Sequence, residues 1–380
     1  MDIQTSKICT LLVTRSCNLN CVYCFEKHKN FPGKKMMDFN TAITILSKEF
    51  DIYRSTYKKG ERFAIEFFGG EPLLNFQLIK DVWHWVKKQE LEFPYIFQIT
   101  TNGTLLTPMV RSWLTERKED FRIILSVDGD ELMQTENRGC RIEDIPIVFV
   151  RDTWEKSYFK MTLSHNTLPN YAKGIISLSQ NGFRIASSLA EGITWSKDEA
   201  VIYRKQLIQI AEFLLQHPNI KPEHPFDYIY KELLVEKSTI SKNCGVGTSI
   251  TTYDTDGRTY PCHLFLPIVH GREEYDKIAT LDFTNPSALI TKECSNCPIV
   301  SLCRTCYGYN YLERGNIANR DKSRCKMHLI EAQVVSAFQI NYLMAKQEQT
   351  QLSAEELLML KSAVLCYEKT KDISIDSFAL

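Results

Sequence analysis

Two groups of cysteines stand out in this sequence, and the first follows an apolar run near the start of the chain. Cys17, Cys21 and Cys24 come directly after the run Ile8–Thr14 and have the spacing Cys-x3-Cys-x2-Cys. Cysteine thiolates bind iron–sulfur clusters, and a [4Fe–4S] cluster normally takes four of them. Three thiolates leave one iron open, as a catalytic metal site requires. The spacing therefore predicts a cluster with an open iron, and the alternative is a buried group of small apolar side chains.

The second group lies in the last third of the chain, where residues 240–327 are rich in Cys, Gly and polar turn residues. Because this region has little apolar periodicity, bound metal would have to hold it together. Paired Cys-x2-Cys motifs also occur in structural zinc sites, so zinc is the alternative to iron–sulfur clusters. The chain has 13 cysteines, an odd number, and no export signal, which argues against a disulfide framework. The members of the group are Cys244, Cys262, Cys294, Cys297, Cys303, Cys306 and Cys325.

Up to about residue 215, apolar β-branched runs alternate with segments of helical periodicity. This alternation predicts an α/β fold with a parallel sheet and right-handed crossovers. No Gly-x-Gly-x-x-Gly follows the first run, so a partial (β/α)6 barrel of the TIM type is favoured over a doubly wound sheet. The predicted strands are Ile8–Thr14, Phe63–Phe68, Tyr95–Thr100, Phe121–Val127, Phe159–Leu163 and Phe183–Ser187, and the predicted helices are Asn40–Tyr57, Phe76–Lys88, Pro108–Glu116, Ala172–Gln180 and Asp198–Gln216.

Glycine and polar residues follow three of these strands, at the end where barrels of this type place their chemistry. Gly69, Gly70 and Glu71 follow the second strand, Asn102 follows the third, and Ser126 lies near the end of the fourth. Glycines allow the backbone to approach a ligand closely, and the polar side chains offer hydrogen bonds or a carboxylate for an ammonium group. Each residue alone fits an ordinary turn. Together, beside a three-cysteine loop, they predict a ligand site.

Three prolines between residues 216 and 225 indicate a domain boundary. We therefore expect a barrel domain at residues 1–225, a Cys-rich domain at residues 226–330 and a helical C-terminal segment at residues 331–380. Within and just before that segment, helical patterning returns at His328–Gln347 and Ala354–Lys369.

The charge balance narrows the classes of function. The chain has 46 basic and 46 acidic side chains, so nucleic acid is not an expected partner. No apolar run approaches the roughly 20 residues that span a bilayer, and the first residues do not resemble a signal peptide. We expect a cytoplasmic protein without a membrane partner.

The first 220 residues resemble radical S-adenosylmethionine (SAM) enzymes. The resemblance rests on Cys17, Cys21 and Cys24, with Tyr23 before the last cysteine, and on the sequence Gly69-Gly70-Glu71-Pro72. It implies that the open iron binds SAM, and that one electron, from a donor such as flavodoxin or ferredoxin, cleaves SAM to a 5′-deoxyadenosyl radical that removes a substrate hydrogen. It also implies that the cofactor is contacted by Tyr23 near the adenine, Gly69, Gly70, Glu71 at the methionine ammonium, Asn102, Ser126 and Arg138.

The seven C-terminal cysteines resemble a SPASM domain, the auxiliary-cluster extension of radical SAM enzymes that modify peptides and proteins. The matching features are Cys244-x12-Gly257-x4-Cys262 and the five residues between Cys297 and Cys303. The resemblance implies two auxiliary clusters and three [4Fe–4S] clusters in all. The outer auxiliary cluster would be held by Cys294, Cys297, Cys303 and Cys325, and the inner one by Cys244, Cys262 and Cys306, with a fourth ligand that the sequence does not identify.

His263 follows Cys262 where sulfatase-maturing enzymes of similar layout carry a catalytic aspartate. A histidine can accept a proton there or donate a hydrogen bond near the cluster.

The leading hypothesis is a maturase that forms a thioether or carbon–carbon cross-link in a ribosomally made peptide or a protein. Formylglycine formation from Cys or Ser of a sulfatase is the alternative, and a non-catalytic, metal-stabilised binding protein is the alternative of another class. Because the first strand begins at once, a leader peptide would be recognised elsewhere on this chain or by a separate leader-binding protein.

Overall fold

The computed structural model describes residues 4–26, 33–234, 242, 244–376 and 378. These residues form two compact units that interleave along the sequence. Unit 1 contains residues 1–126, 139–158 and 244–284, and unit 2 contains residues 127–138, 159–243 and 285–380. The domain boundaries expected near residues 225 and 330 stay predictions.

Unit 1 is built on a mostly parallel sheet with the strand order β4-β3-β2-β1-β7-β8. The strands from β4 to β7 in this order are parallel, and the short β8 pairs with β7 in the antiparallel direction. Six residues of β1, including Leu11 and Leu12, are fully buried, as expected for a parallel strand covered on both faces. The strands are β1 (Gln4–Thr14), β2 (Glu61–Gly69), β3 (Tyr95–Thr101), β4 (Phe121–Ser126), β7 (Ile250–Tyr253) and β8 (Thr259–Tyr260).

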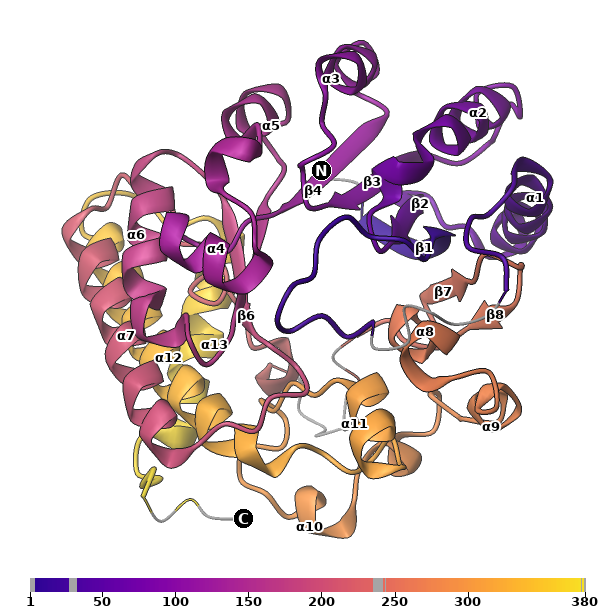
Figure 1. Cartoon of the computed structure of the whole chain (residues 1–380). Coiled ribbons are helices and arrows are strands. Elements are labelled where there is room, and N and C mark those ends of the chain that lie inside the picture. Colours follow the sequence, from indigo (N-terminus) through magenta and orange to yellow (C-terminus); the bar gives the residue numbers. More distant parts are fainter. Residues whose placement is uncertain (1–3, 27–32, 235–241, 243, 377, 379–380) are drawn as a thin grey trace. The chain divides into compact units, whose positions relative to one another are not determined.

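Helices α1, α2 and α3 lie on one side of these strands, and the segment that follows β1 lies on the other side (Figure 1). An aromatic cluster of Phe50, Tyr53, Phe63 and Phe93 packs α1 against the sheet, with ring centroids 4.8–6.1 Å apart. The helices of unit 1 are α1 (Phe39–Thr56), η1 (Pro72–Asn75), α2 (Phe76–Val86), α3 (Pro108–Thr115), η2 (Ile142–Asp144), α5 (Ile147–Thr153), η5 (His263–Phe265), α8 (Pro267–His270) and α9 (Tyr275–Ala279).

The register of the sheet brings the carboxyl ends of its parallel strands to one edge. Thr14, the last residue of β1, pairs with Gly69, the last residue of β2, and Thr101 at the end of β3 pairs with Leu125 of β4. The three-cysteine loop and the loops after β2 and β3 therefore start from neighbouring positions, as the sequence predicts. Parallel βα units of this kind place their ligands at this edge.

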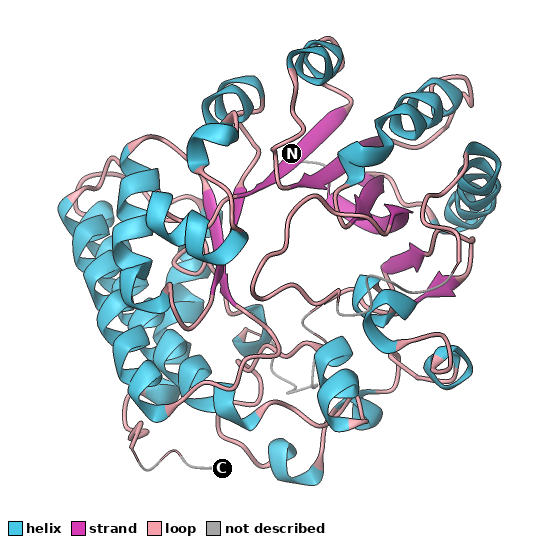
Figure 2. Ribbon diagram, viewed as in Figure 1, coloured by secondary structure: helices cyan, strands magenta, loops and turns pink. Residues whose placement is uncertain are grey.

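Unit 2 contains two parallel strands, β5 (Phe159–Leu163) and β6 (Ile185–Leu189), and is otherwise mostly helical (Figure 2). Its longest helix, α12 (Cys325–Gln347), packs against both α7 (Lys197–Gln216) and α13 (Ala354–Thr370). The remaining helices are α4 (Glu131–Arg138), η3 (Leu168–Asn170), α6 (Tyr171–Gln180), η4 (Lys231–Leu233), η6 (Pro286–Leu289), α10 (Lys292–Ser295), α11 (Tyr307–Arg314) and η7 (Lys322–Arg324).

Most predicted elements are confirmed, and the differences are local. The sixth strand is Ile185–Leu189 rather than Phe183–Ser187, because Phe183 still belongs to the turn that ends α6 and its amide donates to the Leu178 carbonyl. Helices α4 and α5 were not expected from the sequence. Among the described residues, no helix is long and apolar enough to cross a membrane.

Candidate active site

The three-cysteine loop leaves the carboxyl end of β1, and none of its three cysteines is part of a disulfide. The Cys24 amide donates to the Cys21 carbonyl at 3.1 Å, and the Leu19 amide donates to the Cys17 sulfur at 3.4 Å. Burial raises the pKa of Cys17, and the negative charges of Glu71, Glu26 and Cys24 raise it further. A positively charged iron cluster is the kind of group that would hold such thiols as thiolates.

Gly69 and Gly70 at the end of β2 allow the three-cysteine loop to pack directly against the loop that follows β2. A Cβ atom on Gly69 would stand 2.2 Å from the Thr14 carbonyl oxygen, and Gly69 has a φ of +149°. A Cβ atom on Gly70 would stand 2.4 Å from the Ser16 carbonyl oxygen and 2.8 Å from Cys17 Cβ. The Gly70 and Glu71 amides donate to the carbonyls of Thr14 and Ser16. The two glycines are therefore required for the backbone contact that positions Cys17.

Glu71 joins the loops after β2 and β3 from a fully buried position. Its Oε1 accepts hydrogen bonds from the Leu73 amide at 3.1 Å and from Thr101 Oγ1 at 2.7 Å, and its Oε2 accepts one from the Asn102 amide at 2.8 Å. The first of these bonds also caps η1. These donors compensate for burying a carboxylate. Glu71 thus fixes the geometry of the site, whereas its contact with the methionine ammonium of SAM stays a prediction.

Asn102 connects the loop after β3 to the three-cysteine loop. Its side-chain amide nitrogen donates to Asn18 Oδ1 at 2.9 Å, and its oxygen accepts from the Thr104 amide and hydroxyl at 3.0 and 2.7 Å. Asn18 in turn donates to Thr104 Oγ1 at 2.7 Å. The loops after β1, β2 and β3 are therefore linked by one set of polar contacts. Neither Asn18 nor Thr104 was singled out in the sequence, although Asn18 lies within the cysteine motif.

A buried ion pair fixes the entry into the three-cysteine loop. Arg15 donates through Nε and Nη2 to the carboxylate of Asp254, at 3.1 and 2.5 Å, and both side chains are almost completely buried. Asp254 directly follows β7. The loop is thereby anchored to the strand that pairs with β1 on the opposite side from β2.

His263 lies against aromatic side chains of this same unit. Its ring centroid is 4.7 Å from that of Phe68, next to Gly69, and 5.5 Å from that of Phe25, next to Cys24. The residue after Cys262 is thus placed beside both the cysteine loop and the end of β2. The sequence gives the type and position of His263, but only the fold reveals these two neighbours.

Ser126 and Arg138, two further predicted SAM contacts, belong to different units. Ser126 ends β4 in unit 1 and is buried. Arg138 ends α4 in unit 2, where its Nε and Nη2 donate to the two oxygens of Asp128 at 2.9 and 3.2 Å. Asp128 is fully buried and also accepts from Asn137 and from the Thr162 amide. The guanidinium of Arg138 is therefore held in a fixed orientation, and its role in binding SAM stays a prediction.

Cys294, Cys297, Cys303 and Cys325 of the second group all belong to unit 2. Burial and the charges of Cys303, Cys297 and Cys294 together raise the pKa of Cys325 to about 12. Burial raises the pKa of Cys303, and the positive charge of Arg320, which also donates to the Cys303 carbonyl at 3.3 Å, lowers it. The charges of these cysteines thus affect one another's ionisation, and their function as the ligand set of the outer cluster stays a prediction.

The set predicted for the inner cluster is divided between the units. Cys244 and Cys262 belong to unit 1, where burial, together with the charge of Cys244, raises the pKa of Cys262 to about 12. Cys306 belongs to unit 2, where it precedes α11. Among the described residues, no three His, Cys, Asp or Glu side chains are arranged to hold a single metal ion. The thiolates of a [4Fe–4S] cluster bind different irons, and so they stand farther apart than the ligands of one ion.

Comparison with known proteins decides the class of this site. The family model of the radical SAM superfamily matches residues 11–133, a range that includes the three-cysteine loop and the loops after β2, β3 and β4. Residues 11–133 therefore match a radical SAM domain. This match, together with relatives whose names denote enzymes, indicates an enzyme, and it implies SAM and a [4Fe–4S] cluster as cofactors. The three cysteines of the loop after β1, none of which is part of a disulfide, fit that cluster.

Similarity to individual radical SAM proteins extends beyond this domain. The chain is 24% identical over 356 residues to the radical SAM cyclopropyl synthase TigE of Paramaledivibacter caminithermalis, covering 85% of this chain and 72% of that relative. It is 20% identical over 320 residues to a cysteine-type anaerobic sulfatase-maturating enzyme of Clostridium perfringens, covering 76% and 85%. The solved structure of native anSMEcpe with bound AdoMet and Cp18Cys peptide matches with a TM-score of 0.66 at 18% identity, covering 90% of this chain and 100% of that one.

The structural similarity confirms the predicted fold class, a partial barrel followed by a Cys-rich extension and C-terminal helices. It covers the seven cysteines of the second group as well as the radical SAM domain, because 90% of the chain is matched. At this low identity the match establishes the fold alone. The substrate, the reaction and the auxiliary clusters therefore belong to the proposal that follows.

Proposed function

We propose that this radical SAM enzyme acts on a ribosomally made peptide or a protein and closes a thioether or carbon–carbon cross-link in it. The observation that carries this proposal is the similarity to TigE, which extends over 85% of the chain and includes the Cys-rich region. The name of that relative denotes closure of a carbon ring. Further support comes from the anSMEcpe structure, which contains a bound peptide and shares the fold over 90% of this chain.

In this proposal, the residues at the carboxyl ends of the strands bind and orient SAM. Cys17, Cys21 and Cys24 hold the cluster to which SAM binds, and SAM supplies the radical chemistry that removes a substrate hydrogen atom. Tyr23 contacts the adenine, Asn102 and Ser126 donate or accept hydrogen bonds, and the backbone of Gly69 and Gly70 allows close approach. Glu71 provides negative charge for the ammonium group, and Arg138, oriented by Asp128, provides positive charge for the carboxylate.

The Cys-rich region would provide the electron acceptor that a cross-link requires. Closing the new bond removes two hydrogen atoms from the substrate, one as a hydrogen atom and the other as an electron and a proton. The electron acceptor would be an auxiliary [4Fe–4S] cluster. One such cluster would be bound by Cys244, Cys262 and Cys306, and the other by Cys294, Cys297, Cys303 and Cys325. His263 is suited to accept the proton because it lies beside Cys262, Phe68 and Phe25. A hydrogen bond from His263 to the inner cluster is the other role that its position allows.

Formylglycine formation is the second candidate, and the similarity to the sulfatase-maturating enzyme of Clostridium perfringens favours it. That similarity is lower, at 20% identity, and covers 76% of the chain. His263 replaces the aspartate that such enzymes carry after the corresponding cysteine. We therefore place cross-linking first.

The test is incubation of the reduced, cluster-loaded enzyme with SAM and with peptides encoded beside it, including any separate leader-binding protein and a flavodoxin or ferredoxin as electron donor. The proposal predicts a peptide that loses two hydrogen atoms and acquires a new internal link in tandem mass spectrometry. A product that reacts with hydrazides would identify an aldehyde and support formylglycine instead. The Cys24→Ala variant serves as the control without the first cluster. Turnover of SAM with small molecules and with none of the peptides would contradict both candidates.

A further inference from the structure

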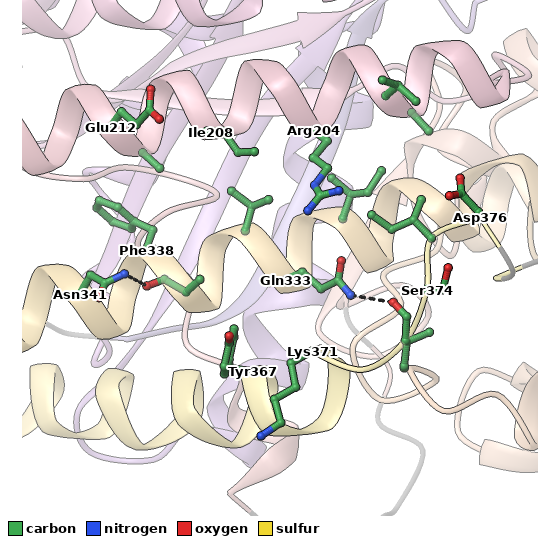
Figure 3. A pocket seen from close by; sticks show the side chains of 18 of the residues that line it. Arg204, Ile208, Glu212, Gln333, Phe338, Asn341, Tyr367, Lys371, Ser374 and Asp376 are labelled. Carbon is green, nitrogen blue, oxygen red and sulfur yellow. Dashed lines mark hydrogen bonds between the residues drawn. The ribbon is translucent and has the colours of Figure 1, made fainter.

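A shallow groove of about 740 Å³ runs along the helical part of unit 2, between α7 and the exposed faces of α12 and α13. One face of α7 forms its edge and includes Glu212, and Figure 3 shows Arg204 and Ile208 directed from that face towards α12. The groove lies on helices far in sequence from the three-cysteine loop. Its lining contains none of the residues that we assign to SAM or to the clusters.

The apolar residues on this face of α7 recur every seven positions. Val201, Ile208 and Leu215 are 65%, 36% and 40% exposed, although all three are large aliphatic side chains. They cover about 21 Å of helix, at 1.5 Å per residue. A repeat of seven is the pattern by which one helix packs along another. Apolar residues exposed in such a row indicate an interaction surface rather than isolated surface positions.

The charged residues on the same face are placed symmetrically about Ile208. Arg204 lies four residues before it and Glu212 lies four residues after it, and both are exposed. Neither side chain forms an ion pair with another residue that the structure describes. Val201 and Leu215 are likewise symmetric, seven residues before and after Ile208. The face is therefore complementary to itself when a second copy of α7 runs in the opposite direction.

We propose that this face is an isologous dimer interface, in which α7 packs antiparallel against α7 of a second copy of the chain about a two-fold axis at Ile208. In this arrangement Arg204 faces Glu212 of the partner subunit, and Glu212 faces the partner's Arg204. The Ile208 side chains meet on the axis, and Val201 packs against Leu215 of the partner subunit. A two-fold axis makes each contact occur twice, as the symmetry of homodimers requires.

The exposed apolar face of α13 lacks this complementarity. Leu358 and Leu365 of α13 are 41% and 39% exposed, with Lys361 between them. An antiparallel pair of α13 helices that matched Leu358 with Leu365 would place both Lys361 side chains within one residue of the two-fold axis, and like charges at short range are repulsive. Self-association through α7 is favoured by the charge pattern, and self-association through α13 is opposed by it.

Charge reversal at Arg204 and Glu212 tests the proposal, because a variant that was merely unstable would not regain dimerisation when the two variants are mixed. One helix pair is a small interface, so we expect a dissociation constant on the order of 10 µM for the cluster-loaded enzyme at low salt. Arg204→Glu places two like-charged pairs in the dimer, and so does Glu212→Arg. The dissociation constant of the dimer should be at least about tenfold higher for each variant alone than for the unmodified enzyme. An equimolar mixture of the two variants restores both opposite-charge pairs, and it should form a heterodimer.

Sedimentation velocity under anaerobic conditions, from about 1 to 200 µM, measures these equilibria, with one variant of the mixture labelled by a fluorophore. The control is Lys361→Glu, which makes the same change of charge on α13 and should dimerise like the unmodified enzyme. Circular dichroism checks that the variants remain folded. The proposal is overturned if the unmodified enzyme sediments as a monomer of 44.0 kDa at every concentration. It is equally overturned if both single variants dimerise normally, or if their mixture gives no heterodimer.

Discussion

Adding one methyl group at Gly70 should remove the first cluster from this enzyme while leaving the fold in place. The Cβ atom of an alanine at this position would be 2.4 Å from the Ser16 carbonyl oxygen, and ordinary contact begins near 3.4 Å. The segment carrying Ser16 and Cys17 must therefore retreat by about 1 Å, because the atoms that it meets are backbone and Cβ atoms rather than a flexible side chain. Metal–ligand distances are held within about 0.2 Å.

Losing a residue that hydrogen-bonds to a metal ligand typically lowers metal affinity by about 10- to 100-fold. Displacing Cys17, one of the three cluster ligands, by about 1 Å should lower the affinity for the cluster at least as much. Gly70→Ala should consequently bind about four fewer irons per chain after reconstitution, and its cleavage of SAM to 5′-deoxyadenosine should fall with that loss. Gly182→Ala is the matched control. It has a φ of +75° and no atom within 4 Å of its Cβ position, so it imposes backbone strain without touching the cluster loop. Iron content and SAM cleavage in Gly70→Ala equal to those of the unmodified enzyme would refute this reasoning.

Three further predictions concern the groups that hold the structure around the site. Arg15→Met should lower the free energy of unfolding by about 3–5 kcal/mol in chemical denaturation, because it leaves Asp254 buried without its partner, and adding Asp254→Leu should recover much of the loss. Glu71→Gln should turn an amide NH2 group towards a buried donor, which lowers the free energy of unfolding by about 1–3 kcal/mol. Hydrogen exchange at the Asn102 amide should become faster, and unchanged exchange would contradict this prediction. Burial and a neighbouring arginine lower the pKa of His224 to about 4, so its contribution to stability is complete above its unfolded pKa of about 6.5 and is lost as the pH falls towards 4. In chemical denaturation, His224→Gln should lose less unfolding free energy between pH 6.5 and pH 4 than the unmodified enzyme does. An equal loss in both proteins would contradict the role given to His224.

The sequence predicts the strands and the location of the site well because both depend on local patterns. The first five strands end within one or two residues of their predicted ends, since buried apolar runs determine them. Helix α4 is not predictable from apolar periodicity, because Met133 is its one buried apolar residue and its other buried residues are polar. Helix α5 was missed because it is short and directly follows Pro146.

The contacts that connect the loops could not be predicted from the sequence. Glu71 was identified as a candidate ligand for SAM, but its three donors come from the loops after β2 and β3, and only the sheet register brings those loops together. The contacts of His263 with Phe25 and Phe68 join positions about 200 residues apart, and no local pattern encodes them. Spacing identifies the residues, whereas the fold determines which of them meet.

The most direct test of this account is the amount of iron, acid-labile sulfide and zinc per chain after anaerobic purification and reconstitution. Three [4Fe–4S] clusters predict about 12 iron and 12 sulfide per chain with no bound zinc, and about 8 iron in a variant with Cys17, Cys21 and Cys24 replaced by alanine. About 4 iron with one or two zinc ions would mean that the Cys-rich region is a structural zinc module. That result would contradict the proposed auxiliary clusters and remove the electron acceptor on which the cross-linking reaction depends.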